Sequence, residues 1–581
     1  MKYLFLLPAL VVGLGLITAT TDFLHAEIFT VTTTNASSSG SLPVRIAQAN
    51  VTPGKNVIKI TVTNVIMLGS PLPTISNSLT ITGGANNPTV ISGGGTLPIF
   101  TFAAGTTNSL SNLVLANGYT TNNGAAISNA SILSISGCVI TNNTAINGFG
   151  GAIFNSGSIA ISSSVISGNQ ANGLGGGIYN IGVLSISQSI FVTNCATGGV
   201  GQNAGLITAG GGGGGGGFGG ALFSASGTVR ITNSTFFQNA AIGGNGGGIT
   251  SSGANSYAGG KGGGGAGGSG GSAGGGGNGG FDSGGGGSSG AGNYYGYPGG
   301  SGGYGGGGAG GGAGTSHLGN PGGLGGQSAA WGGAGIQGDN AGDNGGVGGG
   351  GAGLGGAIFV QGGSCSLINC TIANNFSNGG LDGNGGNSGQ GAAGGVFNYS
   401  GAVLLVNTII AGNNAANSRP DVNGAFISSG FNLIGNNQGA TNLSILDFQN
   451  VSANLGSLQD NGGSTLTCVP LPGSYAIANG ISADAPTIDQ RGVPRPQGGA
   501  FDIGAVQVVT GSPFVTGAAM VSGSGFSLNT IFDATNKYRI QASTNLTTWI
   551  DLVTNSSGGT LYFTDTGATN LNRRFYRTAT P

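Results

Sequence analysis

Charged side chains are scarce in this sequence. The 581 residues include 14 Lys and Arg and 15 Asp and Glu, which is 5% charged residues against about 25% in an ordinary soluble protein. No charged residue occurs between Lys59 and Arg230, and no carboxylate occurs between Glu27 and Asp282. Because the chain has no basic stripe that would neutralise phosphates, we expect no nucleic-acid partner.

Residues for acid–base catalysis are correspondingly few. Enzymes that cleave polysaccharides need paired carboxylates or acidic metal ligands, and the uncharged stretch supplies neither. His317 is the only histidine after residue 26, and it lies in a glycine-rich segment. Asp339, Asp343 and Asp382 offer oxygens for calcium, but no nonapeptide repeats around them. We expect no catalytic residue, cofactor or metal site, with a polysaccharide lyase or glycoside hydrolase on a β-helix scaffold as the alternative.

The five cysteines form no evident pairs. Cys365 and Cys370 lie up to ~17 Å apart on an extended strand, and a disulfide needs a Cα separation of about 6 Å. We therefore expect free thiols that pack as small apolar residues.

The amino terminus has the pattern of a secretory signal peptide. Lys2 precedes an apolar run over residues 3–17, and Ala26 ends a small-residue cleavage site. We expect residues 1–26 to be removed and the mature chain to be secreted or held on the cell surface. No second long apolar run follows, so we expect no transmembrane span after cleavage.

Glycine is abundant, with 132 residues, and part of it belongs to a sequence repeat. Gly-Gly-Ala-Ile-Phe-Asn at 150–155 recurs in similar form at 175–180, 219–224 and 355–360. Each copy is followed by an alternating apolar pair and then by an apolar run that ends in Asn, at nearly constant spacing. Alternation with a period of two predicts strands. Three short strands make one coil, which buries its inner face only by stacking on its neighbours.

We therefore predict an all-β fold: a right-handed parallel β-helix over residues 57–414, after an amino-terminal cap at 27–56. The Asn that closes each coil should form a column whose side-chain amides bond to each other as a structural ladder: Asn117, Asn143, Asn169, Asn194, Asn239, Asn375 and Asn413. The aromatic residues of the repeat form a second column, either as stacking between coils or as a platform for sugars: Phe154, Tyr179, Phe223, Phe359 and Phe397.

These repeats resemble those of the chlamydial-type polymorphic outer-membrane proteins and related bacterial β-helix surface proteins. Phe236 to Asn239 is the best match to their Phe-x-x-Asn form. Those families are adhesins and surface proteins, so the resemblance implies a structural, adhesive or ligand-binding role. We expect no counterpart of the translocating barrel that those families carry at the carboxy terminus.

Glycine-rich segments at 198–217 and 243–353 interrupt the repeat, and all long insertions leave the same corner of the coil. Two interpretations stay open: a flexible Gly/Ser brush, or a bundle of extended strands of the polyproline-II type.

The repeat ends near residue 414. Residues 415–507 resemble the choice-of-anchor Q domain of exported bacterial proteins, through Asp460-Asn461-Gly462-Gly463, Asp489-Gln490-Arg491-Gly492 and Asp502-Ile503-Gly504-Ala505. Arg491 with Asp489 or Asp502 is a candidate buried ion pair in a cap that closes the open end of the rod. Residues 513–581 resemble a fibronectin-III-like β-sandwich with Trp549 in its core.

These observations together predict an exported protein with a structural, adhesive or binding role. An extracellular glycan or a cell-surface component is the expected partner, and we expect a monomer.

Overall fold

The computed structural model describes most of the chain after residue 25. The described residues are 26–84, 87–204, 208–249, 261–263, 275–288, 296–313, 324–328, 330–338, 345–383, 387–416, 419–509, 514–521, 525–532, 537–555, 559–571 and 573–579. The predicted signal peptide therefore lies outside them, apart from Ala26. No helix among the described residues is long and apolar enough to cross a membrane.

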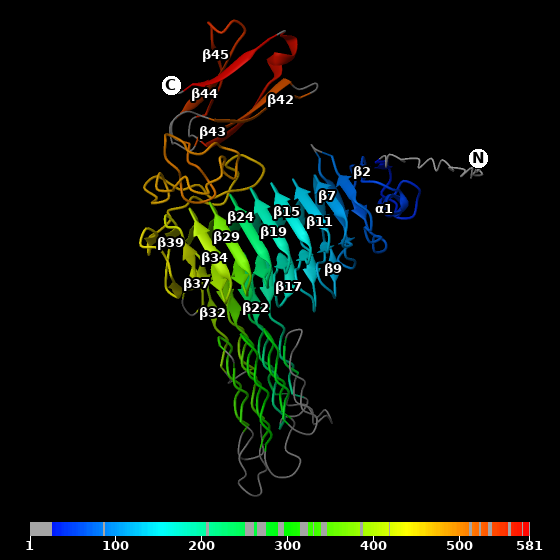
Figure 1. Ribbon diagram of the computed structural model, residues 1–581, viewed down its shortest axis with the longest axis vertical. Coiled ribbons are helices and arrows are strands. Elements are labelled where there is room, and N and C mark those ends of the chain that lie inside the picture. Colours follow the sequence, from blue (N-terminus) through cyan, green and yellow to red (C-terminus); the bar gives the residue numbers. More distant parts are fainter. Residues whose placement is uncertain are drawn as a thin grey trace, which may run out of the picture.

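The chain folds into a right-handed parallel β-helix whose coils present parallel strands on successive faces (Figure 1). This confirms the predicted fold class. Sheet A has eleven strands: β1 (Ile28–Val31), β2 (Asn56–Ile60), β4 (Leu79–Thr82), β7 (Thr107–Ser111), β11 (Ile132–Ser136), β15 (Ser158–Ser162), β19 (Val183–Ser187), β24 (Thr228–Thr232), β29 (Ser364–Ile368), β34 (Ala402–Val406) and β38 (Ile427–Ser428).

Sheet B, also of eleven strands, follows sheet A in each coil. It contains β3 (Ile66–Met67), β5 (Thr89–Ser92), β8 (Leu113–Ala116), β12 (Val139–Thr141), β16 (Val165–Ser167), β20 (Ile190–Val192), β25 (Thr235–Phe237), β30 (Thr371–Ala373), β35 (Ile409–Ala411), β39 (Leu433–Ile434) and β41 (Phe448–Gln449).

Sheets C, D and E complete the coils. Sheet C contains β6 (Phe100–Phe102), β10 (Ile127–Asn129), β14 (Ile153–Asn155), β18 (Ile178–Asn180), β23 (Leu222–Ser224), β28 (Ile358–Val360), β33 (Val396–Asn398), β37 (Val422–Ala425) and β40 (Ala440–Thr441). Sheet D contains β9 (Tyr119–Thr120), β13 (Thr144–Ala145), β17 (Gln170–Asn172), β21 (Cys195–Thr197), β26 (Ala240–Ile242), β31 (Phe376–Asn378) and β36 (Asn414–Ala415), and sheet E contains β22 (Gly217–Phe218), β27 (Gly353–Leu354) and β32 (Gly391–Ala392).

The core is a set of aliphatic columns inside the coils. In sheet A, Leu110, Ile135 and Ile161 lie side by side on neighbouring strands and are fully buried. Each such side chain contributes about 1.5–3 kcal/mol through burial. The helix α1 (Leu42–Val51) packs its buried Leu42 and Ile46 into the same core at the amino-terminal end.

The coils extend further than the repeat indicated, because parallel pairing continues past Asn413 to β41. The cap predicted for the open end is wrong in its placement. Residues 453–508 run back along the outer face of sheet B, where Gln490 bonds to Thr235 and Asn233 bonds to the carbonyl of Ile488. Buried Ile409 and Leu433 on this outer face pack against Ala453, Ala476 and Ile503. We call residues 453–508 the docking segment.

The glycine-rich insertions leave the rod at one corner, between sheets D and E. Thr197, Ile242 and Asn378 are aligned at the end of sheet D, and Gly217, Gly353 and Gly391 are aligned at the start of sheet E. In the uninterrupted coil, Asn172 aligns with Thr197 and is followed directly by Gly173. The insertions therefore add chain at a single point without changing the register.

The described glycine segments form a bundle of extended chains that projects from the rod (Figure 1). Residues 210–217 donate backbone hydrogen bonds to three neighbouring segments, and every third N–H reaches the same segment. The N–H groups of residues 210, 213 and 216 bond to the carbonyls of residues 288, 285 and 282, and those of 211, 214 and 217 bond to the carbonyls of 346, 349 and 352. The N–H groups of residues 212 and 215 bond to the carbonyls of 202 and 199. A period of three residues is that of the polyproline-II helix. The brush interpretation is therefore wrong for the described residues, and the ordered bundle is the one observed.

Glycine is required inside this bundle because neighbouring backbones touch. A Cβ on Gly213 would lie far inside contact distance of the Gly307 carbonyl, and one on Gly214 would do the same to Gly244. Collagen excludes side chains from its axis for the same reason.

Two three-stranded antiparallel sheets form the carboxy-terminal module. One contains β42 (Phe514–Val521), β43 (Gly525–Phe532) and β46 (Gly559–Asp565), and the other β45 (Ile550–Asn555), β44 (Tyr538–Ser543) and β47 (Phe575–Ala579), with a 3₁₀ turn η1 (Thr566–Asn570). Tyr538 is fully buried in its core. Trp549, expected there, is half-buried instead and lies 4.2 Å from the guanidinium carbon of Arg577.

Gly213→Ala tests the packing of the bundle. We expect the added methyl to destabilise the bundle by about 1–3 kcal/mol or more, as in other overpacked interiors. Amides of residues 210–217 should then exchange faster with deuterium, as measured by mass spectrometry. Gly248→Ala is the control, since its Cβ would meet nothing closer than 3.2 Å. Unchanged exchange in Gly213→Ala would contradict the bundle.

Candidate functional site

The asparagine column lies inside the corner between sheets B and D. From Asn169 to Asn413, each side-chain oxygen accepts both the backbone N–H and the Nδ2–H of the preceding asparagine in the column, as when Asn143 donates both groups to Asn169 at 3.0 and 2.9 Å. The same links join Asn169, Asn194, Asn239, Asn375 and Asn413. The second Nδ2 hydrogen of each residue bonds to a backbone carbonyl, for example Asn169 to Ile140 at 2.9 Å.

Asn117 is not part of this ladder. The register aligns Asn117 with Asn142, and the backbone N–H of Gly118 donates to Asn143 instead, at 2.7 Å. Asn117 has a positive φ of 53°. Later residues of the column that contains Asn117 and Asn142, such as Thr193 and Asn374, have a similar φ, near 55°. Because asparagine occupies both position 142 and position 143, the sequence alone does not show which of the two aligns with Asn117.

The ladder ends on a carboxylate. Asn413 donates its backbone N–H and its Nδ2–H to Oδ1 of Asp421, at 2.9 and 2.8 Å. A second column behaves in the same way: Asn432 donates both groups to Asp447 at 3.0 and 2.9 Å. A carboxylate accepts several hydrogen bonds and needs to donate none, so it completes a column that has no further coil to bond to.

The aromatic column is mostly covered. Its rings stack along the rod at centroid distances of 5.1–5.6 Å. Phe223, Phe359 and Phe397 are buried beneath rings from the base of the bundle, including Phe218, and Trp331 lies edge-on to Phe397. Phe154 and Tyr179 remain half-buried. Three of the five rings therefore pack the bundle onto the rod and offer no open face to a sugar.

The predicted ion pair forms between Asp489 and Arg491, whose side chains are fully buried, with Nε to Oδ2 at 3.0 Å. Asp502 accepts the backbone N–H groups of Ala478 and Val508. Burial lowers the pKa of the nearby Arg495 to about 10. The printed side-chain bonds of Asp489, Arg491 and Arg495 join parts of the docking segment to each other.

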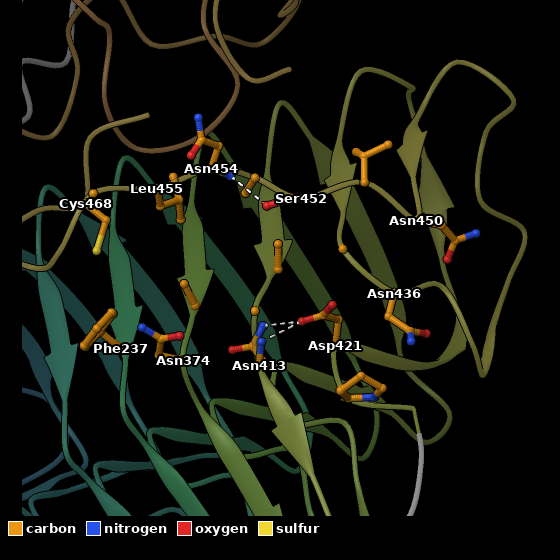
Figure 2. A pocket seen from close by; sticks show the side chains of 18 residues that line it. Phe237, Asn374, Asn413, Asp421, Asn436, Asn450, Ser452, Asn454, Leu455 and Cys468 are labelled. Atoms are coloured by element: carbon orange, nitrogen blue, oxygen red, sulfur yellow. Dashed lines mark hydrogen bonds between the residues drawn. The ribbon is translucent and has the colours of Figure 1, made fainter. Parts of the chain in front are cut away.

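A cleft of about 660 Å³ opens where the docking segment leaves the rod (Figure 2). One wall is the corner after sheet B, with Asn374, Asn413 and Asn436, and the other is the stretch from Asn450 to Gly456. Asp421 lies at its base, close to the end of the asparagine ladder. The sequence offered no signal for this cleft beyond the density of asparagine around residues 436–454.

The electrostatics of the cleft depend on Asp421. Burial raises the pKa of its carboxyl to about 6, although hydrogen bonds from Asn413 and from the backbone of Asn436 oppose that shift. The other ionisable lining group is the Cys468 thiol, whose pKa burial raises to about 12. No lysine, arginine or histidine is among the described residues that line the cleft.

Few groups in the described part of the chain suit metal or redox chemistry. No cluster of three or more potential metal ligands occurs within the described ranges. His317 and the acids at 339 and 343 lie outside them. The cysteines are free thiols, of which Cys195 is half-buried and the others are buried.

Comparisons with known proteins give no family. No protein-family model matches the chain, and no curated protein matches it. The fold therefore defines the class, a parallel β-helix protein, and the resemblances to outer-membrane protein repeats and to the choice-of-anchor Q domain stay predictions.

Asp421→Asn tests the buried carboxyl at the end of the ladder. The pKa of Asp421 is about 6 in the folded protein, above the ordinary 3.8, so folding favours the protonated carboxyl. Protonation of Asp421 therefore stabilises the folded state fully below pH 3.8, and this stabilisation is lost as the pH rises through 6. We expect the free energy of unfolding of the wild type to fall from pH 4 to pH 7 relative to Asp421→Asn. Urea melts at several pH values measure this slope.

Asp484→Asn, at an exposed carboxyl, is the control for that experiment. Parallel pH profiles for the wild type and Asp421→Asn would contradict the raised pKa.

Proposed function

We propose that this protein is an exported, surface-associated β-helix protein with an adhesive or ligand-binding role and no catalysis. The observation that supports this most is the position at which the glycine bundle is inserted into the rod. The insertions begin and end at adjacent positions of successive coils, so the rod keeps its register while it carries a hydrogen-bonded projection. Repeat proteins commonly place binding elements as insertions on one face.

The composition fits the same role. The coils satisfy their buried polar groups with amides and hydroxyls, as in the asparagine ladder, and need no ion pairs. Such a rod keeps its internal bonding over a wide range of pH and salt, because screening acts on charges and not on neutral hydrogen bonds. Stability of this kind suits a protein that works outside the cell, and the expected partners remain extracellular glycans or cell-surface components.

A variant without the bundle tests this proposal. Joining Thr197 to Gly217, Ile242 to Gly353 and Asn378 to Gly391 reproduces the uninterrupted Asn172–Gly173 connection in each coil. We expect this variant to keep the β-sheet circular dichroism of the rod and to lose at least tenfold in retention on glycan-array or cell-surface ligands that the full chain binds. Equal retention of both proteins would contradict a binding role for the bundle.

One observation favours a second candidate, a polysaccharide lyase or glycoside hydrolase. Asp421 lies in a cleft, and its pKa of about 6 is suited to a general acid. Hydrolases generally use two carboxyl groups about 5–10 Å apart, and Asp421 is the only carboxyl among the described residues that line the cleft.

Incubation with neutral and acidic polysaccharides decides between the two. We expect no release of reducing ends and no unsaturated product above the level of Asp421→Asn. Turnover by the wild type that is lost in Asp421→Asn would replace the binding proposal with the enzymatic one.

A further inference from the structure

The cleft beside Asp421 holds polar groups that have no partner within the described part of the chain. The side-chain amide of Asn374 makes no hydrogen bond to any described residue. Asn436 and Asn450 use Oδ1 to accept the backbone N–H groups of Gln438 and Asn437, and their Nδ2 groups stay unpaired. Asn454 donates its Nδ2–H to Pro472, which leaves its Oδ1 open. The walls therefore present both amide donors and amide acceptors.

The charge of the cleft disfavours an anionic ligand. A cleft without any basic residue cannot balance a phosphate, a sulfate or a uronate. A hydroxyl group both donates and accepts, which matches side-chain amides and a carboxylate. Val451 and Leu455 add apolar surface on the docking-segment side, and a volume of about 660 Å³ lies within the usual range for small-ligand sites, ~300–1,000 Å³.

We propose that this cleft binds a neutral oligosaccharide. The amides of Asn374, Asn436 and Asn450 donate to ligand hydroxyl oxygens, and Asp421 accepts a hydrogen bond from a ligand hydroxyl. This inference rests on the proposed binding function, and it places a site on the rod itself, apart from the bundle.

The ligand should bind more tightly as Asp421 ionises. A carboxylate accepts a hydroxyl hydrogen more strongly than a neutral acid does. Arg419, two residues away, bonds to Asn423 and lies over the ring of Trp331, outside the lining, and the Cys468 thiol stays neutral. Affinity should therefore increase from pH 5 to pH 8.

The chain offers a matched pair of variants. Asn374 and Asn142 occupy the same column, both are exposed, and both have a φ near 55°. Gly168 and Gly412 occur in that column naturally with φ of 62° and 71°, so glycine is compatible with the backbone there. Asn374→Gly removes a cleft amide, and Asn142→Gly makes the same change away from the cleft.

The experiment is calorimetric titration of the full chain with neutral pentasaccharides of glucose, xylose, mannose and N-acetylglucosamine, with pentagalacturonate and Ca²⁺ alone as comparators. We expect at least one neutral pentasaccharide to bind, with affinity about tenfold lower for Asp421→Asn and several-fold lower for Asn374→Gly. Asn142→Gly should match the wild type. Thermal melts establish that each variant is folded.

Three results would overturn the inference: no binding of any neutral pentasaccharide, equal affinity in Asn374→Gly and Asn142→Gly, or a heat of binding seen only with Ca²⁺ or pentagalacturonate. The variant without the bundle separates this outcome from that of the proposed function. If that variant keeps pentasaccharide binding, the cleft is a site of its own, whether or not the bundle mediates adhesion.

Discussion

The β-helix and the glycine bundle depend on hydrogen bonds between adjacent backbones, because charged side chains are almost absent from their coils and chains. A coil with no ionisable side chain must pair every buried N–H and C=O with the next coil, because an unpaired buried polar group costs about 1–3 kcal/mol. The asparagine ladder applies the same rule to side chains: Asn239 uses both Nδ2 hydrogens, and its oxygen accepts two hydrogen bonds from Asn194. Stacking in register is the arrangement that satisfies all of these groups together.

The glycine bundle meets the same constraint with different geometry. Sheets bond each chain to two neighbours, whereas residues 210–217 bond to several, because three successive N–H groups of a polyproline-II helix point in three directions. Such contacts need backbones closer than any side chain permits. The high glycine content is thus a packing requirement, and it explains why a segment that resembles a flexible linker in composition is ordered.

The sequence predicted the coils because their period is local, and it failed where burial depends on distant segments. The repeat predicts Ile153 and Ile178 facing inward, but it does not reveal what covers the outside. In β12 and β16 the outward residues, a valine and a hydroxyl residue on each strand, are half-buried, whereas β25 and β35 are buried on both faces. Consecutive apolar residues do not distinguish the covered strands, because Val139-Ile140 in half-buried β12 is such a pair, as are Phe236-Phe237 and Ile409-Ile410 in the covered strands. The docking segment is the layer that covers those strands.

The candidate site follows from how the ladder ends. A column of amides with aligned N–H groups must stop at an acceptor, and Asp421 is placed there by the coil that follows Asn413. The docking segment then leaves the rod beside that acceptor and creates the cleft. No local pattern encodes this, since Asp421, Asn436 and Asn454 belong to different elements that meet only in the folded chain. The termination of a structural column thereby places a carboxyl with a raised pKa at the base of a cleft lined by amides.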